Sequence, residues 1–218
     1  MKLSVLLATV FFAAAGLASA APLCITGTMA SYELLAGGCT IGNLLFSNFA
    51  YTGVAVPNST VTLAPVDGGY SPGPGITFSS SGWTATASPD GVVNIDSSIL
   101  FDVSALDGRP IITDGSLTLL SSGSTGTGVA EIGETIEPGN IQLQVNARGP
   151  LVSHVVFVPT STVNVLKDVL VRVPQGAAGS GTAFIGSFEE DFSEVPEPVG
   201  AILIGSGLLA LGIWRRRG

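Results

Sequence analysis

Two cysteines are the residues whose type and spacing most directly suggest chemistry in this chain. Cys24 and Cys39 are its only cysteines. An even count, in an oxidising compartment, favours a disulfide that closes a loop of about 15 residues and ties down the start of the mature chain. A structural zinc site is a weak alternative, because it needs four nitrogen or sulfur ligands and the chain has one histidine, His154. A catalytic thiol is equally weak, since no histidine or aspartate lies near either cysteine in the sequence.

The remaining titratable residues predict no catalytic site. The chain contains no His-Glu-x-x-His, phosphate-loop or dinucleotide-binding motif. His154 lies in an apolar stretch, and we interpret it as a half-buried strand residue rather than as part of a Ser-His-Asp triad. Four acidic residues near the ends of expected strands could ligate calcium, although no EF-hand spacing appears: Asp96, Asp102, Asp107 and Asp114. We therefore expect no catalytic residue, no metal ligand and no cofactor.

Short strands must position these residues. Apolar and polar residues alternate with a period of two, and Asp-Gly and Gly-Asn pairs mark turns between the runs. The expected strands are 44–52, 59–64, 75–79, 82–87, 98–104, 116–120, 129–136, 141–146, 151–158, 161–173 and 182–188. No segment of the domain shows a helical period over three turns. The pattern predicts an all-β domain, an antiparallel β-sandwich of jelly-roll or immunoglobulin-like type.

Several smaller features refine this expectation. Phe46 and Phe49 cannot share one face of a regular strand, so a β-bulge or burial on both sides is expected. Trp83 is interpreted as a packing residue rather than a sugar-stacking surface. Residues 121–128 and 68–75 are rich in small residues and turn formers, which predicts long loops. The acidic run 189–191 is expected to be a solvated linker.

The first twenty residues are typical of a cleaved secretory signal peptide. A short positive segment precedes an apolar stretch, 3–17, and an Ala-Ser-Ala site ends it. Cleavage between Ala20 and Ala21 would start the mature chain at Ala21. An uncleaved N-terminal anchor is the alternative. The expected organisation is therefore a signal peptide at 1–20, an extracytoplasmic domain at 21–194 and a separate tail at 195–218.

The tail has three parts. Pro196, Glu197 and Pro198 form an extended, accessible segment, because proline lacks an N–H group and fixes φ. Residues 199–214 carry no charge and would form a transmembrane helix about 24 Å long, which is short for a bilayer. A cytoplasmic stop signal follows, in the order Arg215, Arg216 and Arg217. A buried core helix is the weaker alternative for the apolar stretch.

This order of Pro-Glu-Pro, apolar helix and terminal arginines resembles the PEP-CTERM sorting signal of exported proteins in Gram-negative bacteria. The resemblance covers about the last 23 residues. It implies recognition by an exosortase, a transpeptidase-like enzyme of the inner membrane that cuts near the motif, and an association with exopolysaccharide. The segment 38–51, a cysteine followed by Ile-Gly and Phe-Ser-Asn-Phe, also resembles uncharacterised extracytoplasmic proteins that carry this signal.

Charge and export together define the expected function. The terminal segments hold four of the eight basic residues and one of the sixteen acidic residues, so the domain between them carries about −11. Such a surface repels nucleic acid. We expect an exported, non-enzymatic protein, anchored in the inner membrane and then delivered to the cell surface or outside, with a structural or adhesive role beside exopolysaccharide. The alternatives are a secreted carbohydrate-active enzyme and a calcium-dependent carbohydrate-binding module.

Overall fold

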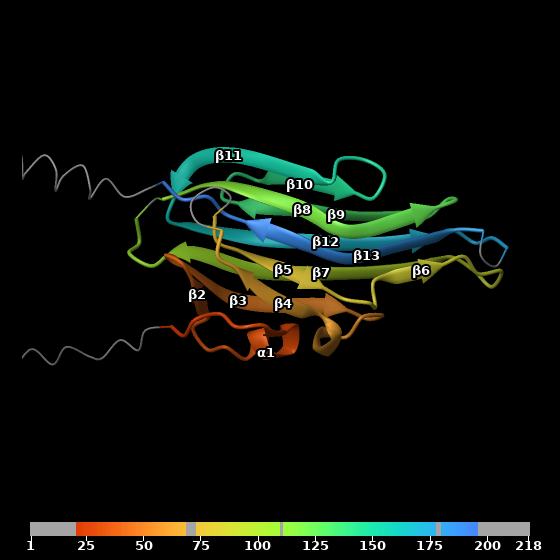
Figure 1. Ribbon diagram of the computed structural model, residues 1–218, viewed down its shortest axis with the longest axis horizontal. Helices are drawn as coiled ribbons and strands as arrows, with labels where there is room; N and C mark the ends of the chain where they lie inside the picture. Colours follow the sequence, from red (N-terminus) through yellow and green to blue (C-terminus); the bar gives the residue numbers. More distant parts are fainter. Residues whose placement is uncertain (1–20, 69–72, 110, 178–179, 196–218) are drawn as a thin grey trace, which may run out of the picture.

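The protein folds into two stacked antiparallel β-sheets (Figure 1). The computed structural model describes residues 21–68, 73–109, 111–177 and 180–195. The predicted signal peptide, including Ala20, and the tail from Pro196 onward lie outside these residues. Among the described residues, no helix has the length and apolar character that crossing a membrane requires. The transmembrane helix expected at 199–214 falls outside this range.

The first sheet, here sheet A, has six strands in the order β10-β9-β12-β7-β3-β2. Every neighbouring pair is antiparallel. The bounds of its strands are β2 Cys39–Ile41, β3 Leu44–Gly53, β7 Val93–Ala105, β9 Val129–Glu137, β10 Ile141–Asn146 and β12 Thr162–Val173.

The second sheet, sheet B, has seven strands, with the path β1-β4-β5-β13-β8-β11 and β6 paired to β13. Its strands are β1 Gly27–Thr28, β4 Thr62–Val66, β5 Gly75–Ser79, β6 Thr84–Thr86, β8 Ile112–Thr125, β11 Val152–Thr160 and β13 Thr182–Asp191. Two short helical turns complete the chain, α1 at Met29–Glu33 and η1 at Asn58–Thr60. Since strands from β7 onward alternate mostly between the sheets, neighbours in space are distant in sequence.

The core lies between the sheets and is built by the alternation that the sequence displays. Along β12 the residues at odd positions are buried and those at even positions are largely exposed. Aromatic rings fill the centre: Phe78 stacks on Phe188 at 5.1 Å between ring centroids, and Trp83 packs against Phe188 at 5.6 Å. Trp83 is fully buried and donates to Ser97 Oγ at 3.2 Å. Its predicted role in packing is confirmed.

Both described ends of the chain lie at one end of the sandwich (Figure 1). Glu194 pairs with Ile112, the first residue of β8. The turns that follow β8 and precede β13 lie at the opposite end (Figure 1). The sandwich therefore has an end from which the chain leaves and a far end made of turns.

The strand predictions agree with the structure in most places. Each of the eleven expected strands overlaps an observed one, and 75–79 and 141–146 match in full. The predicted bulge is confirmed, because the pairing of β3 with β7 shifts between Ser47 and Ala50 while Phe46 and Phe49 are both buried. Short β1, β2 and α1 were not expected.

Two segments were assigned wrongly. Residues 121–125 belong to β8, although their small side chains suggested a loop, because pairing with β13 supplies the hydrogen bonds. Residues 189–191 end β13 instead of forming a solvated linker, and Glu190 is fully buried. The acidic composition of this run suggested a linker, but the alternation of buried and less buried residues along β13 continues through Glu190.

Candidate functional site

The predicted disulfide between Cys24 and Cys39 is confirmed, with a Cα–Cα distance of 4.8 Å. Hydrogen bonds from Cys24 N to Thr40 O and from Thr40 N to Pro22 O reinforce it. The disulfide attaches the segment after Ala21 to β2, at the edge of sheet A. The remaining residues of the expected signals, Ala20, the Pro-Glu-Pro motif and the three terminal arginines, lie outside the described residues.

The aspartates considered for calcium are dispersed. Asp102 accepts hydrogen bonds from Asn48 and Asn164, each at 2.6 Å, and Asp107 pairs with Arg109. Asp114 contacts His154 and the backbone N–H of Ser193 instead. Within the described part of the chain, no three His, Cys, Asp or Glu side chains converge as metal ligands would.

His154 and Asp114 form the nearest approach to a catalytic triad. His154 Nε2 lies 3.4 Å from Asp114 Oδ2 on the outer face of sheet B. The other oxygen of Asp114 accepts from the backbone N–H of Ser193 at 2.9 Å. Among the described hydrogen bonds, none joins His154 to a serine hydroxyl. The side chain of His154 is 49% exposed and lies in β11, which agrees with the half-buried strand residue expected.

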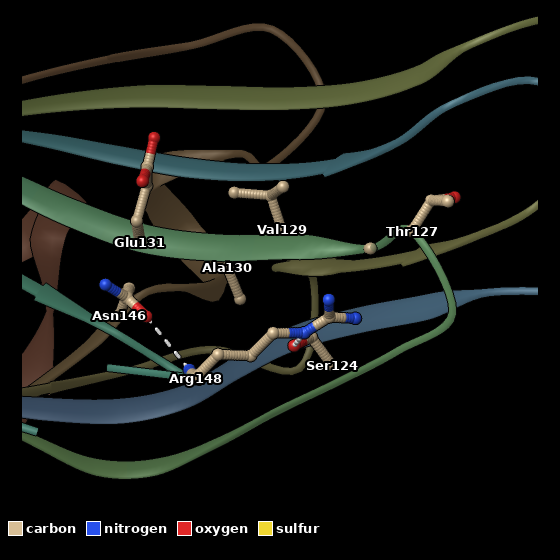
Figure 2. A pocket seen from close by; sticks show the side chains of 8 residues that line it. Ser124, Thr127, Val129, Ala130, Glu131, Asn146 and Arg148 are labelled. Atoms are coloured by element: carbon tan, nitrogen blue, oxygen red, sulfur yellow. Dashed lines mark hydrogen bonds between the residues drawn. The ribbon is translucent and has the colours of Figure 1, made fainter. Parts of the chain in front are cut away.

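A small polar pocket opens at the far end of the sandwich, between the β8–β9 turn and the end of β10 (Figure 2). Its volume is about 240 Å³. This is below the range of about 300–1,000 Å³ that holds drug-sized ligands, so the pocket suits a single small ring or polar group. Its walls are Ser124, Thr127, Gly128, Val129, Ala130, Glu131, Asn146 and Arg148.

The guanidinium of Arg148 is the principal polar group of this pocket. Arg148 Nε donates to Ser124 Oγ at 2.8 Å, and Nη2 donates to Gly126 O at 2.5 Å. Asn146 Oδ1 accepts from the backbone N–H of Arg148 at 2.9 Å, the contact dashed in Figure 2. These bonds fix the arginine across the mouth of the pocket. Two of its five N–H donors are used, and no described residue accepts from the others.

The pocket is also lined by a carboxylate, that of Glu131, which lies on the other side of β9 from Arg148 (Figure 2). Glu131 and Val129 point to the outer face of sheet A, whereas Ala130 points to the side where Arg148 lies (Figure 2). Gln144 Nε2 donates to Glu131 Oε2 at 3.4 Å. The lining thus combines a guanidinium, a carboxylate, one amide and two hydroxyl groups with the small apolar side chains of Val129 and Ala130.

A second charged cluster lies inside the sandwich. Lys167 of β12 is fully buried and contacts two buried carboxylates, Glu134 of β9 and Glu190 of β13. Its Nζ donates to Glu134 Oε2 and, at 2.7 Å, to Glu190 Oε2. The Oε1 atoms of both glutamates have no hydrogen-bond partner among the described residues. We call these three residues the core cluster.

Burial shifts the acidity of the core cluster and its neighbour Asp191. Loss of water around Lys167 lowers its pKa, although the nearby Glu190 carboxylate opposes this change. Burial raises the pKa of Glu190, against the attraction of Lys167. Burial also raises the pKa of Asp191 to about 7, and repulsion from Glu189 and Glu190 adds to the effect.

The phase of the charged residues within their strands indicates the core cluster in the sequence. Lys167 occupies the inward phase of its strand, between the buried Val165 and Val169. Glu134 likewise stands between the buried Ile132 and Ile136. A charged residue in the apolar phase of an alternating strand indicates a buried polar group. The pocket has no comparable signal, because its residues come from turns and strand ends.

Comparison with known proteins gives no family. No protein-family description matches the chain, and no curated protein matches it. Among solved structures, the carbohydrate-binding module TmCBM61, solved in complex with β-1,4-galactotriose, is 11% identical, with a TM-score of 0.30 over 69% of this chain and 90% of that one. The enzymatically active domain of bacteriophage CBA120 tailspike protein 4 is 14% identical, with a TM-score of 0.24 over 72% of this chain and 20% of that one. At these TM-scores, neither likeness carries an argument about function.

Proposed function

We propose that this chain is an exported, non-enzymatic envelope or matrix protein whose sandwich domain binds polysaccharide through the far-end pocket. The observation that carries the proposal is the placement of that pocket relative to the chain ends. The tail with the predicted sorting signal follows directly after Val195, and the turn between β8 and β9, which lines the pocket, lies at the other end of the domain (Figure 1).

The length of β8 sets the separation between the two ends. Glu194 is bridged to Ile112, and Ser124 of the pocket lies twelve residues further along the same strand. At about 3.3 Å per residue, this span is roughly 40 Å. A chain held through its C-terminus would present the pocket away from the membrane, where an extracellular polymer is accessible.

The chemistry of the pocket suits a sugar residue. Hydroxyl groups of a pyranose both donate and accept hydrogen bonds, and carboxylate-bearing sugars pair with a guanidinium. Arg148 supplies donors, Glu131 supplies an acceptor, and Asn146 and Ser124 supply both. Arg148 is one of four basic residues in a domain of about −11, which places a rare positive charge at the site.

The alternative functions have weaker support. A glycoside hydrolase needs two carboxylates about 5–9.5 Å apart in a cleft. Each of the four pockets described by the structure is lined by one carboxylate at most. A calcium-dependent module needs converging oxygen ligands, and the described acidic residues do not provide them.

Export rests on the terminal signals together with the disulfide. Disulfides persist in oxidising compartments, so the Cys24–Cys39 bond is compatible with a domain outside the cytoplasm. An exosortase of the inner membrane is the proposed partner. We expect Pro196→Ala combined with Pro198→Ala to leave a full-length, membrane-bound form in the native host. Processing and release of that double variant at the wild-type level would contradict the proposed sorting.

Polysaccharide binding is tested by affinity electrophoresis and calorimetry against neutral and acidic exopolysaccharide fractions from the native host. Arg148→Ala should weaken binding by about ten-fold to a hundred-fold, the loss expected for hydrogen bonds to a charged group. Arg109→Ala is the matched control, because Arg109 is an exposed arginine in the turn before Ile112, which begins β8, whereas Ser124 of the pocket lies at the other end of that strand. Equal binding by both variants, or no binding by the wild type, would overturn the proposed site.

A further inference from the structure

The core cluster contains the one lysine of the domain, and that lysine has no access to water. Lys2 and Lys167 are the only lysines of the chain, and Lys2 belongs to the predicted signal peptide. Lysine is almost never fully buried, because its ammonium group is strongly hydrated. Its complete burial beside two glutamates therefore requires an explanation, which the saccharide pocket does not provide.

Charge alone explains the cluster poorly. If all three residues are ionised, one positive and two negative charges lie between the sheets, with a net charge of −1 and almost no exposure to solvent. Desolvation of each ion costs several kcal/mol, and the attraction repays it only when the remaining polar atoms are satisfied. Here the Oε1 atoms of Glu134 and Glu190 lack partners among the described residues.

Strand pairing places two residues of the core cluster opposite each other in sheet A. Lys167 and Glu134 are directly opposite on the antiparallel neighbours β12 and β9. Directly opposite side chains have Cβ atoms about 4.5–5.5 Å apart, so both side chains can meet on the inner face of sheet A. Glu190 approaches the same Nζ from sheet B at 2.7 Å.

Two aromatic rings close the site. The Nζ of Lys167 lies 5.9 Å from the ring centroids of both Phe101 and Phe188. Both rings are fully buried. An amine and a carboxyl group held in contact in a dry, aromatic environment are positioned for reaction, because proximity replaces a bimolecular encounter and water cannot reverse the step.

We propose that Lys167 and Glu134 become joined by an amide bond between Nζ and Cδ, with Glu190 as the proton carrier. The neutral amine attacks the Cδ of the protonated Glu134 carboxyl, so a C–N bond forms and the C–O bond to the hydroxyl group breaks. Glu190 takes a proton from the attacking nitrogen and passes it to the departing hydroxyl, which leaves as water. Carbon and nitrogen keep their oxidation states, so no oxidant, reductant or activating group is needed.

The acid–base state of the cluster favours this step. Burial lowers the pKa of Lys167, which increases the fraction of neutral, nucleophilic amine. Burial raises the pKa of Glu190, which suits a group that must hold and release a proton. The product removes the buried ammonium and one carboxylate, and it leaves Glu190 free to stay neutral.

The amide would link two adjacent central strands through residues that are 33 positions apart in the chain. It would act as a second covalent tie, remote from the disulfide at the edge of sheet A. Such a bond does not depend on the proposed polysaccharide binding, and either idea can fail while the other stands.

The intact mass of the purified, folded domain tests the amide. After reduction and denaturation, the wild type should be lighter than its sequence by one water molecule. Lys167→Met and Glu134→Ala should have their full sequence masses, and Glu190→Gln should lose water far more slowly. Glu131→Ala is the matched control, because Glu131 lies on the outer side of the same strand β9, and it should still lose water. A full sequence mass for the folded wild type would overturn the proposal.

Peptide mapping identifies the bonded residues. Trypsin cuts after Arg148 and Arg172, while proline follows Arg109, so Glu134, Lys167 and Glu190 fall into three different fragments. The proposal expects the fragment 149–172 joined to the fragment that ends at Arg148, with no cut after Lys167. A bond to the fragment that begins at residue 173 would overturn the assignment of Glu134. Labelling of Lys167 by an amine reagent in the denatured wild type would overturn the bond itself.

Discussion

The core cluster and the far-end pocket each hold a basic side chain among polar groups, but the cluster is buried and the pocket is open to solvent. In the core, Lys167 meets two glutamates with no exposure to water. In the pocket, Arg148 holds Ser124 and the Gly126 carbonyl at the surface. Exposed polar contacts contribute little to stability and can exchange partners with a ligand, whereas buried charges must keep theirs. The buried cluster therefore suits a structural role, and the exposed pocket suits ligand binding.

The largest expected effect comes from removing the side chain of Lys167. Lys167→Ala leaves Glu134 and Glu190 buried in the core without their partner, and removing one partner of a buried polar cluster costs about 3–5 kcal/mol of unfolding free energy. Urea unfolding followed by circular dichroism measures it. Arg172→Ala, which removes an exposed cation of the same strand, should cost less than about 1 kcal/mol. Similar losses from both variants would remove the distinction between buried and exposed charge.

The disulfide offers a covalent reference for these energies. Cys24 and Cys39 are 15 residues apart, and a loop of this size corresponds to about 3 kcal/mol in the chain-entropy account. The double variant Cys24→Ser with Cys39→Ser should therefore unfold at a lower urea concentration by about that amount. An unchanged midpoint would mean that the N-terminal segment contributes little to the folded state.

A smaller effect should appear as a pH dependence. Asp191 keeps its proton in the folded domain up to about pH 7, whereas in the unfolded chain it ionises near pH 4. Between these values the folded state binds more protons, so the free energy of unfolding falls as the pH rises. The melting temperature should be lower at about pH 8 than at about pH 5.

Asp191→Asn isolates this contribution. The amide cannot ionise, so the variant should lose part of the pH dependence, while Asp90→Asn in an exposed turn should keep it. Glu190 also has a raised pKa and should supply part of the same slope. A wild type that gains stability as the pH rises from 5 to 8 would contradict the raised pKa of Asp191.

The smallest expected effect on stability belongs to the pocket. Arg148→Ala removes hydrogen bonds at an exposed site and should change the unfolding free energy by less than about 1 kcal/mol. Thermal melts beside the binding assay would show it. A large loss of stability would mean that Arg148 supports the β8–β9 turn rather than a ligand.

The sequence predicted local structure better than it predicted the sites. Alternation and turn residues located most strands, because both depend on a few neighbouring residues. The strand order was not predictable, since β12 pairs with β7 and β9 through contacts that are remote in sequence. The disulfide was predictable because two cysteines allow one pairing.

The same limit explains why the charged sites were missed. Lys167 and Glu134 share a row only because β12 and β9 are neighbours, and Glu190 joins them from the other sheet. The run 189–191 looked like a linker because its composition is acidic, although its alternation with Phe188 indicated a strand. Arg148 comes from the turn after β10 and Ser124 from the end of β8, so their contact depends on the complete fold.

The intact mass of the protein recovered from the native host, by compartment, tests the central claim of an exported domain most directly. We predict a form outside the cytoplasm that begins at Ala21 and lacks the apolar stretch 199–214. A cytoplasmic protein that retains the whole sequence from Met1 to Gly218 would contradict it.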